Sequence, residues 1–459
     1  MRRGHWLLVI SVALAALACV VGGAARATPS GDSRASRPTA AGLRFLGSFT
    51  SSPGGYWVYP VAVATDAAGD VYVAEEDYSS NGRIEKFSRT GAFITRWGSG
   101  GSGDGQFFGT MSLAIDPAGN VYVGDDNDRI QKFSSTGVFI TKWGSHGSGA
   151  GQFDSLRGLA TDAAGNVYVG GGGSARIQKF SSTGTFITQW GSFGEGNGQF
   201  HYPGGVATDA AGNLYVADGG FETDRIQKFS STGAFITTWG GAGSGDGQFE
   251  DPKGVATDAA GNVYVVDFFN DQIQKFSSTG AFITKAGSAG SGDGQFKSPA
   301  GVAIDRAAGY LYVADVQNHR IDKFSILPEL SALSITPNVL TATGQGAQVR
   351  YTLSEPTKVG FSVQRETPGH RDNNGGCVAN TALNRLAKTC TRLIAVDSFV
   401  IIGKAGVNNF HFAGRLANKL DPRSLAHKLD PGRYWLLAAP IVGPGKGASA
   451  SEPFQIKVP

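Results

Sequence analysis

Three histidines, His146, His201 and His319, are the strongest metal-ligating candidates in the N-terminal part of the chain. Three imidazoles leave one position open on a zinc ion, which is the arrangement of a catalytic site that activates water. The three residues fall in different copies of a repeated segment, however, and at unmatched places within it. We therefore keep a metal-dependent lyase or hydrolase as the alternative function. We expect no cofactor for the non-catalytic function that we prefer below, with bound zinc or calcium as the less favoured possibility.

Acidic residues in glycine-rich segments could bind calcium. The sequence GSGDGQF occurs at residues 101–107, 243–249 and 290–296 and contains Asp104, Asp246 and Asp293. A calcium ion takes about six to eight oxygen ligands, whereas each segment offers one carboxylate. We favour a turn at each of these segments.

An acidic residue followed a few positions later by arginine recurs at a fixed place in the repeat, and such a pair forms charge-assisted hydrogen bonds. The acids are Glu76, Asp125, Asp218, Asp267 and Asp315, and the matching residues are Arg83, Arg129, Arg225, Gln272 and Arg320. One further copy keeps Arg176 but has Gly171 in place of the acid. Arg176 and Asp267 thus lack their repeat partner, so they either face a ligand or reflect decay of the repeat.

The elements that position these residues are copies of one unit. A turn that opens with aspartate and precedes a hydrophobic strand recurs at Asp66, Asp116, Asp162, Asp209, Asp258 and Asp305, with intervals of 50, 46, 47, 49 and 47 residues. A period of about 40–50 residues with strand patterning is typical of a β-propeller. Each unit contains four short runs rich in β-branched and aromatic residues, separated by turn residues, and four antiparallel strands form one blade.

The two ends of the repeat region predict a closed ring. The sixth unit, from about Pro299 to Ser325, lacks its fourth strand, whereas an isolated strand, Leu43–Phe49, precedes the first unit. We expect this strand to pair with Arg320–Ser325, which removes an open sheet edge. The predicted fold is all-β, with a six-bladed β-propeller over residues 42–326 closed by its N-terminal strand.

The units resemble NHL repeats. Residues 295–324, QFKSPAGVAIDRAAGYLYVADVQNHRIDKF, carry the Pro-x-Gly, Leu-Tyr-Val-Ala-Asp and Asn-His-Arg-Ile elements of that pattern. The resemblance implies a six-bladed scaffold. Members of this family mostly bind proteins, some bind RNA, and a few related propellers are metal-assisted lyases or hydrolases, so the fold alone does not choose a function.

Tryptophan recurs at one place in four units, as Trp97, Trp143, Trp190 and Trp239, with Ala286 in the fifth unit. Large aromatic side chains contribute strongly to packing in a core. We favour packing between blades over carbohydrate stacking for these residues.

Residues that differ between units define the candidate binding face, because blade-to-blade and second-to-third-strand connectors emerge on one side of a propeller. They are Tyr59, Val61, Tyr78, Phe108, Met111, Asp126, Arg157, Arg176, His201, Tyr202, Phe221, Glu222, Lys253, Asp267, Phe268 and Phe269. Exposed aromatic residues among scattered charges are typical of a protein-binding surface. We expect a non-catalytic scaffold that presents this face to an extracellular or cell-envelope protein or glycan.

The N-terminus has the pattern of an export signal. Arg2 and Arg3 precede the apolar run Trp6–Val21, and a small-x-small cleavage site ends at Ala27. We expect a signal peptide over residues 1–27, a disordered leader over residues 28–41 and a secreted or cell-surface protein. No transmembrane segment is expected after signal removal. The net charge of +3 gives no indication of a nucleic-acid partner, and none is expected.

Residues 327–459 depart from the repeat and predict an Ig- or fibronectin-like β-sandwich of about seven short strands. The region resembles all-β modules at the ends of exported actinobacterial proteins. Cys377 and Cys390 have twelve residues between them and are expected to form one disulfide in an exported chain. A metal site at these cysteines is the alternative, with His370 as the only nearby histidine.

Overall fold

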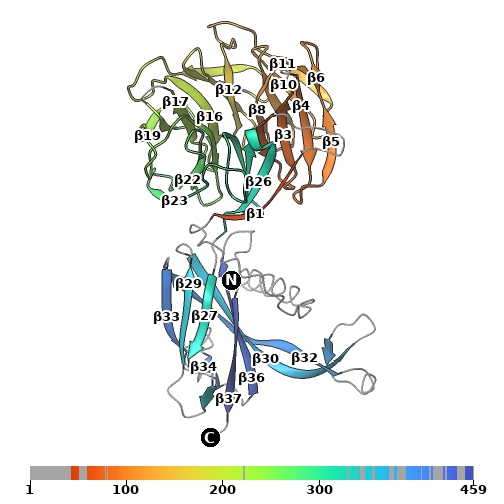
Figure 1. Ribbon diagram of the computed structural model, residues 1–459, viewed down its shortest axis with the longest axis vertical. Helices are drawn as coiled ribbons and strands as arrows, with labels where there is room; N and C mark the ends of the chain where they lie inside the picture. Colours follow the sequence, from red (N-terminus) through yellow and green to blue (C-terminus); the bar gives the residue numbers. More distant parts are fainter. Residues whose placement is uncertain are drawn as a thin grey trace, which may run out of the picture.

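A computed structural model gives the fold of the protein (Figure 1). It describes residues 43–50, 59–77, 79, 81–220, 223–327, 330–336, 339–341, 347–353, 357–371, 377–379, 389–404, 406–412, 415–416, 427–428, 432–441 and 450–457. The predicted signal peptide and leader lie outside the described residues. In the described part of the chain, no helix has the length and apolarity needed to cross a membrane.

Six antiparallel sheets of four strands each form the blades of a propeller. Blades one and two are β2 (Tyr59–Thr65), β3 (Val71–Glu76), β4 (Gly82–Phe87), β5 (Phe93–Trp97) and β8 (Thr110–Ile115), β9 (Val121–Asp125), β10 (Arg129–Phe133), β11 (Phe139–Trp143). Blades three and four are β12 (Leu156–Thr161), β13 (Val167–Gly171), β14 (Arg176–Phe180), β15 (Phe186–Trp190) and β16 (Tyr202–Thr208), β17 (Leu214–Gly219), β18 (Arg225–Phe229), β19 (Phe235–Gly240). Blades five and six are β20 (Pro252–Thr257), β21 (Val263–Asp267), β22 (Gln272–Phe276), β23 (Phe282–Ala286) and β24 (Pro299–Asp305), β25 (Tyr310–Asp315), β26 (Arg320–Ser325), β1 (Arg44–Phe49).

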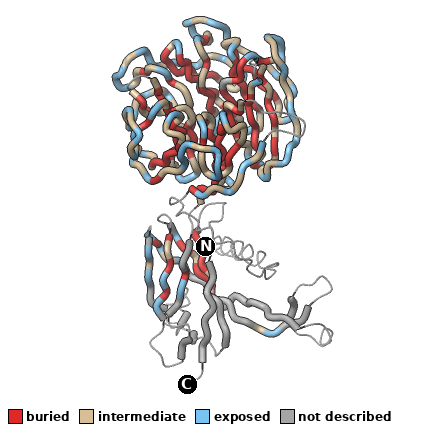
Figure 2. Tube along the Cα trace, viewed as in Figure 1, coloured by how far each residue is buried: buried red, intermediate tan, exposed pale blue. Residues whose placement is uncertain are grey.

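The second strand of each blade is buried on both faces because it lies between two neighbouring blades. In β9, Val121, Tyr122 and Val123 are fully buried, and their equivalents in the other blades are buried in the same way. Figure 2 shows buried segments inside the ring and exposed segments along its rim. Burying one large apolar side chain contributes about 1.5–3 kcal/mol. The repeated aliphatic–tyrosine–aliphatic sequence is therefore the main source of the propeller core.

The N-terminal strand completes blade six, as predicted from the two ends of the repeat. β1 pairs antiparallel with β26, and Phe49 lies opposite Ile321. Trp97 lies opposite Ile84 at the same place in blade one. Phe49 thus occupies in blade six the position that tryptophan occupies elsewhere, and it packs on Phe87 of blade one with ring centroids 5.1 Å apart. The ring is closed by the same inter-blade packing that joins its other blades.

The junction between blades six and one also carries an ion pair, between Arg89 and the buried Asp305. In blades two to five the turn aspartate accepts a hydrogen bond from an asparagine, as in blade four, where Asn213 Nδ2 donates to Asp209 Oδ2 at 2.8 Å. The turn of blade six has no asparagine, whereas serine occupies the position of Arg89 in blades two to five. Arg89 therefore supplies the donor that the turn of blade six lacks.

The tryptophans pack between blades, as predicted. The ring of Trp97 lies 6.0 Å from the ring of Phe133 in blade two. A Cβ on Gly137, in the turn between the third and fourth strands of blade two, would come within 2.6 Å of the Trp97 ring. Blade six has no such turn, because its fourth strand comes from the N-terminus. A tryptophan in blade five would lack this partner, which accounts for Ala286.

The C-terminal region contains two larger sheets. One consists of β27 (Leu330–Thr336), β29 (Ala347–Leu353) and β33 (Gly406–Phe412). The other contains β28 (Val339–Thr341), β37 (Ala450–Lys457), β36 (Gly432–Ile441), β30 (Thr357–Arg371) and β31 (Cys377–Ala379), with β32 (Thr389–Gly403) on β30, and β34 (Arg415–Leu416) pairs separately with β35 (His427–Lys428).

Two features of this region bear on its sequence predictions. β30 and β32 have 15 residues each and pair along nearly their whole length, so they are longer than the short strands predicted for this region. Figure 1 shows the resulting long two-stranded arm. The side chains of Cys377 and Cys390 lie outside the described residues, so the disulfide stays a prediction. The Ig-like assignment stays a prediction as well.

Candidate functional site

The inner strands of the blades run between two faces of the propeller. They are β2, β8, β12, β16, β20 and β24. They begin at the face that carries the blade-to-blade connectors and the second-to-third-strand connectors, which we name the variable face. They end at the face where the aspartate turns lead into the second strands, which we name the turn face.

On the turn face the same hydrogen bonds recur from blade to blade. In blade four, Asp209 Oδ1 accepts the backbone N–H groups of Ala211 and Asn213, each at 2.9 Å. Its Oδ2 accepts the Tyr215 hydroxyl at 3.1 Å, and the equivalent tyrosine bonds in blades one, two, three and five measure 2.9–3.2 Å. Burial opposes ionisation of Asp209, but the hydrogen bonds from Asn213 and Tyr215 lower its pKa overall. These acids stabilise the turns.

The inner strands are also joined to one another at the turn face. The hydroxyls of Thr208 and Thr257 each donate to the carbonyl oxygen of the equivalent residue in the preceding blade, at 2.7 Å. Arg306 of blade six donates to the carbonyl oxygens of Thr208 and Thr257 at 2.9 and 3.0 Å. This end of the propeller axis is held by threonine hydrogen bonds that recur in the repeat and by Arg306, which only blade six carries at this place.

At the variable face a β-bulge interrupts every inner strand. The register of β12 against β13 shifts between Leu156 and Gly158, which leaves Arg157 outside the ladder. The first residue at this shift in each blade, which we name the axial position, is Val61, Met111, Arg157, Gly204, Lys253 or Ala300. A bulged residue makes no regular ladder contacts, and bulges commonly re-aim side chains beside functional sites. The axial side chain can therefore change without disturbing the blade.

Glycine follows the axial position in blades three to six and brings the next blade close. A Cβ on Gly158 would lie 2.2 Å from the carbonyl oxygen of Gly204, and one on Gly205 would lie 2.0 Å from that of Lys253. The axial backbone of blades four and five is therefore held by close packing, although the axial side chains differ. The repeat thus fixes the backbone at the axial position, whereas the type of side chain there can vary.

The acid at the end of the second strand fixes the connectors of the variable face. Asp218 Oδ1 accepts the backbone N–H groups of His201 and Tyr202 at 2.8 and 3.1 Å. Its Oδ2 pairs with Arg225 Nε at 3.1 Å. The matching nitrogen–oxygen distances are 3.1 Å for Arg129–Asp125 and 3.2 Å for Arg320–Asp315. The predicted acid–arginine pairing is confirmed in these three blades.

In blade one the predicted pair is wrong by one residue. Arg83 forms its ion pair with Glu75, not with Glu76. The cause is the register of the ladder, which places Glu75 opposite Arg83 and Glu76 opposite Gly82. Glu76 is left at the end of β3 on the variable face.

Arg176 and Asp267, predicted to lack their repeat partner, are both buried and form hydrogen bonds to backbone and amide groups. The buried Nε of Arg176 has no hydrogen-bond partner among the described residues. Arg176 Nη2 donates to the carbonyl oxygen of Gln152 at 3.0 Å. Asp267 Oδ2 accepts from Gln272 Nε2 at 2.8 Å, and its Oδ1 accepts the Glu250 N–H at 2.7 Å. Of the two alternatives, decay of the repeat fits these residues better than a ligand-facing role, because both side chains are buried and bond to the connectors or to the substituted glutamine.

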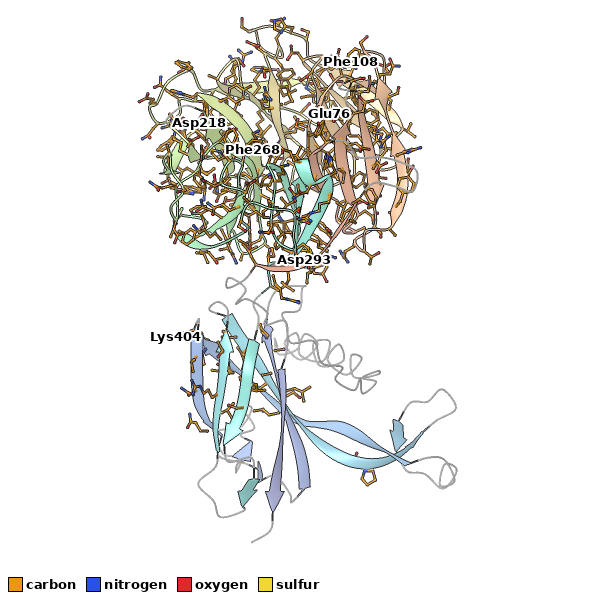
Figure 3. The ribbon with its side chains drawn as sticks, in the orientation of Figure 1. Glu76, Phe108, Asp218, Phe268, Asp293 and Lys404 are labelled. Atoms are coloured by element: carbon orange, nitrogen blue, oxygen red, sulfur yellow. The ribbon has the colours of Figure 1, made fainter. Side chains whose placement is uncertain are left out.

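Arg157 and Lys253, at the axial positions of blades three and five, pack on aromatic rings. The guanidinium carbon of Arg157 lies 5.0 Å from the centroid of the Tyr202 ring. Lys253 Nζ lies 3.1 Å from the centroid of Phe268, which Figure 3 labels. A cation over an aromatic face gains about 0.5–2 kcal/mol. The rings thus hold both charges at the variable face.

Several ionisable groups at the variable face are shifted toward their neutral forms. Burial raises the pKa of Glu76 to about 7, and the charge of Asp126 raises it further while that of Arg157 lowers it. Burial also lowers the pKa of Lys253, an effect that Asp251 opposes and Arg157 strengthens. Shifts of this kind, driven by desolvation and specific neighbours, occur often at functional sites.

The other residues predicted for the variable face differ in how far they are exposed to solvent. Phe269 is 61% exposed, Phe108 44% and Tyr202 37%, and Figure 3 labels Phe108 and Glu76 among the propeller side chains. Asp126 is exposed, and Tyr59, Val61 and His201 are partly buried. The backbone of Met111 lies in β8. Tyr78, Phe221 and Glu222 lie outside the described residues.

Phe193 belongs to this surface but was not predicted. It is 72% exposed, and its ring stacks on His201 with centroids 4.9 Å apart. The equivalent residues of other connectors are His146, Ala242 and Ala289. The equivalent positions of the other connectors hold small or polar residues, so the aromatic residue here is the sequence feature that could have identified Phe193.

The structure does not bring the three histidines together. His146 Nδ1 bonds Asp128 Oδ2 at 2.8 Å, His201 stacks on Phe193, and the ring of His319 lies 5.8 Å from that of Tyr59. Among the described residues, no group of three histidine, cysteine, aspartate or glutamate side chains could hold a metal ion. The three-histidine site considered from sequence is therefore wrong.

The GSGDGQF segments form turns, as favoured from sequence. The Gly103 N–H donates to Gln106 Oε1 at 2.9 Å within the first segment. Asp104 pairs with Lys142 across 2.6 Å. The corresponding distance for Asp246 and Lys285 is 3.0 Å. These two aspartates form surface ion pairs with the outer strands of their neighbouring blades.

Two family profiles match parts of this propeller. A profile described as a 6-bladed beta-propeller matches residues 257–331, and the NHL repeat profile matches residues 200–229. Both matches fall mainly in blades four to six, where the sequence resemblance to NHL repeats was also clearest. No curated protein matches the chain.

Solved structures similar to this chain include two lyases and a lactonase. A streptogramin B lyase structure has 15% identity and a TM-score of 0.43, over 62% of this chain and 99% of the other. Virginiamycin B lyase from Staphylococcus aureus has 13% identity and a TM-score of 0.41, over 58% and 95%. A gluconolactonase from Xanthomonas campestris has 13% identity and a TM-score of 0.43, over 59% and 86%.

Proposed function

We propose that this protein is a secreted, non-catalytic binding scaffold whose variable face engages an extracellular or cell-envelope partner. The observation that carries the proposal is the contrast at the axial bulges. The surrounding backbone repeats from blade to blade, whereas the axial residue is aliphatic, basic or glycine. Variation confined to places that the fold leaves free is typical of a recognition surface built on a rigid scaffold.

The exposed aromatic residues around these positions support the same function. Phe108, Phe193 and Phe269 are each more than two-fifths exposed, and Phe269 lies beside the cation–aromatic pair of blade five. Aromatic residues and arginine are enriched at the energetic centres of interfaces. The export signal predicted at residues 1–27 supports a partner outside the cell.

The test uses the mature chain, residues 28–459, immobilised and exposed to secreted and cell-envelope material from the producing organism. The wild type is expected to retain a specific partner. A variant with Phe108→Ser and Phe269→Ser is expected to lose it, because the exposed anchors are gone. The control is Val138→Ser, which changes a 64% exposed apolar residue near the turn face. Equal retention by all three proteins would contradict the proposal.

A further inference from the structure

Two axial positions carry basic residues in similar surroundings. Arg157 and Lys253 stand at the same place in the bulges of β12 and β20, two blades apart. Each cation lies over an aromatic ring, Tyr202 for Arg157 and Phe268 for Lys253. Tyr202 keeps part of its surface exposed, and the exposed Phe269 packs edge-on against Phe268 with centroids 4.8 Å apart. Each cation therefore lies beside aromatic surface that solvent can reach.

The axial position between the two cations is Gly204, where a side chain would make only ordinary van der Waals contacts. A Cβ built on Gly204 has no non-neighbouring atom closer than 3.8 Å, in contrast to the 2.0 Å contact at the adjacent Gly205. Its backbone is not in the left-handed region. A side chain is therefore sterically acceptable at position 204, and its absence leaves room between Arg157 and Lys253.

The two cations are incompletely neutralised by the protein. Arg157 Nε donates to Ser155 Oγ at 3.0 Å. The charge of Arg157 also lowers the pKa of the nearby Glu76 and Asp126, but no ion pair between Arg157 and either carboxylate is formed among the described residues. Lys253 Nζ lies 3.6 Å from Asp251 in a contact that is partly exposed. An added carboxylate would gain both a planar guanidinium partner and an ammonium partner. Partial burial of the two cations strengthens that attraction.

We propose that Arg157 and Lys253, with Tyr202 and Phe269 beside them, bind an acidic oligosaccharide that carries uronate carboxylates. Each unit of such a polymer offers a carboxylate and an apolar C–H face on the same ring, which matches a cation and an aromatic surface on the same blade edge. Two matched pairs with an open position between them fit a repeating ligand. This inference rests on the proposed function and specifies the partner of the variable face.

The test measures binding of oligogalacturonate to the full mature chain by titration calorimetry. Arg157→Ala and Lys253→Ala are each expected to weaken binding by about tenfold or more, because each removes a charged partner of a carboxylate. Methyl-esterified oligogalacturonate, which has the same rings without the charge, should bind at least about tenfold more weakly. Binding of the acidic oligomer should also weaken as salt is raised.

The variant Gly204→Glu gives the sharpest result. It places a tethered carboxylate between the two cations and should abolish oligogalacturonate binding, whereas Gly204→Ser should retain it with the same unfolding midpoint. Unchanged binding in Gly204→Glu would overturn the site. Binding of oligoglutamate with no binding of oligogalacturonate would overturn the glycan assignment in favour of an acidic peptide.

The failure of this inference is distinguishable from failure of the proposed function. If the double variant of Phe108 and Phe269 loses a partner that Gly204→Glu retains, the variable face binds through its aromatic residues and the acidic-oligosaccharide site is wrong. If the aromatic variant and Gly204→Glu both retain every partner, the proposed function fails as well.

Discussion

The two faces of the propeller are made by the same six units, but some of their carboxylates have pKa values shifted in opposite directions. On the turn face, hydrogen bonds from asparagine and tyrosine outweigh burial and lower the pKa of Asp116, Asp162 and Asp209. On the variable face, burial outweighs the available partners and raises the pKa of the partly buried Glu76. The turn aspartates are thus stabilised as anions by their hydrogen bonds, whereas Glu76 is not.

This difference teaches how a repeat protein separates stability from recognition. The turn-face bonds recur because each closes a turn or joins neighbouring blades, so loss of one weakens the ring. The axial residues lie in bulges outside the ladder, so they can differ without that cost. Ionisable groups whose charged forms are not fully stabilised by the fold occur often at functional sites.

The largest expected effect is on the turn face. Asp209→Ala leaves two backbone N–H groups, the Asn213 amide and the Tyr215 hydroxyl without their acceptor. We expect the free energy of unfolding to fall by about 2–4 kcal/mol, measured by urea denaturation with tryptophan fluorescence. Ligand binding below the unfolding midpoint should be unchanged. A loss of affinity without a loss of stability would reverse the roles assigned to the two faces.

The pH dependence of stability should differ between the faces. Burial raises the pKa of Glu76 from 4.5 to about 7, so the folded state binds the proton more tightly than the unfolded state. Its contribution to stability is fully present below pH 4.5 and is lost as pH rises through about 7.

Glu76→Gln removes this dependence, since the amide stays neutral. The variant should be more stable than the wild type at pH 8, by on the order of 1–2 kcal/mol, and should show no such gain at pH 4. The measurement is the difference between the two unfolding free energies as a function of pH. A difference that is flat across this range would show that Glu76 is not destabilised in the folded state.

The closing junction should be sensitive to Arg89, on the turn-face side of blade one. Arg89→Ser restores the residue found in blades two to five and leaves the buried Asp305 without its ion pair. Because the arginine side chain is partly exposed, solvent screening limits the loss to about 1 kcal/mol. The control is Lys297→Ser, which changes an exposed cation in the connector before blade six. Equal effects of the two substitutions would contradict a special role of Arg89.

The smallest effect on stability is expected from Phe269→Ser, on the variable face. Phe269 is mostly exposed, and exposed substitutions usually change stability by less than about 0.5 kcal/mol. The thermal unfolding midpoint should stay close to that of the wild type. A large decrease would assign Phe269 to the core and remove it from the recognition surface.

The parts of the fold that repeat could be predicted from sequence, and the parts that depend on register could not. The missing fourth strand of blade six and the isolated Leu43–Phe49 predicted the closure, because a propeller cannot leave an edge open. Ala286 could also be understood only with that closure, since it faces the one blade without a third-to-fourth-strand turn. The closure was predicted by counting and strand patterning alone, whereas the explanation of Ala286 needed the packing of the structure.

The candidate site was harder to predict because β-bulges and backbone hydrogen-bond acceptors do not depend on a particular residue type, so the sequence does not reveal them. The bulge that frees Arg157 and Lys253 is visible only in the strand register. Arg176 seemed unpaired because its acceptors are backbone carbonyls, which every residue carries. Glu76 was assigned to Arg83 because the alignment of blade one with the others shifts by one residue at the end of β3.

The central claim is that the partner contacts the variable face and not the turn face. The most direct measurement is photo-crosslinking with a benzophenone amino acid placed at position 269 or, in a second protein, at position 138. We predict that the partner crosslinks efficiently from position 269 and at background level from position 138. Efficient crosslinking from position 138 together with background crosslinking from position 269 would contradict the account.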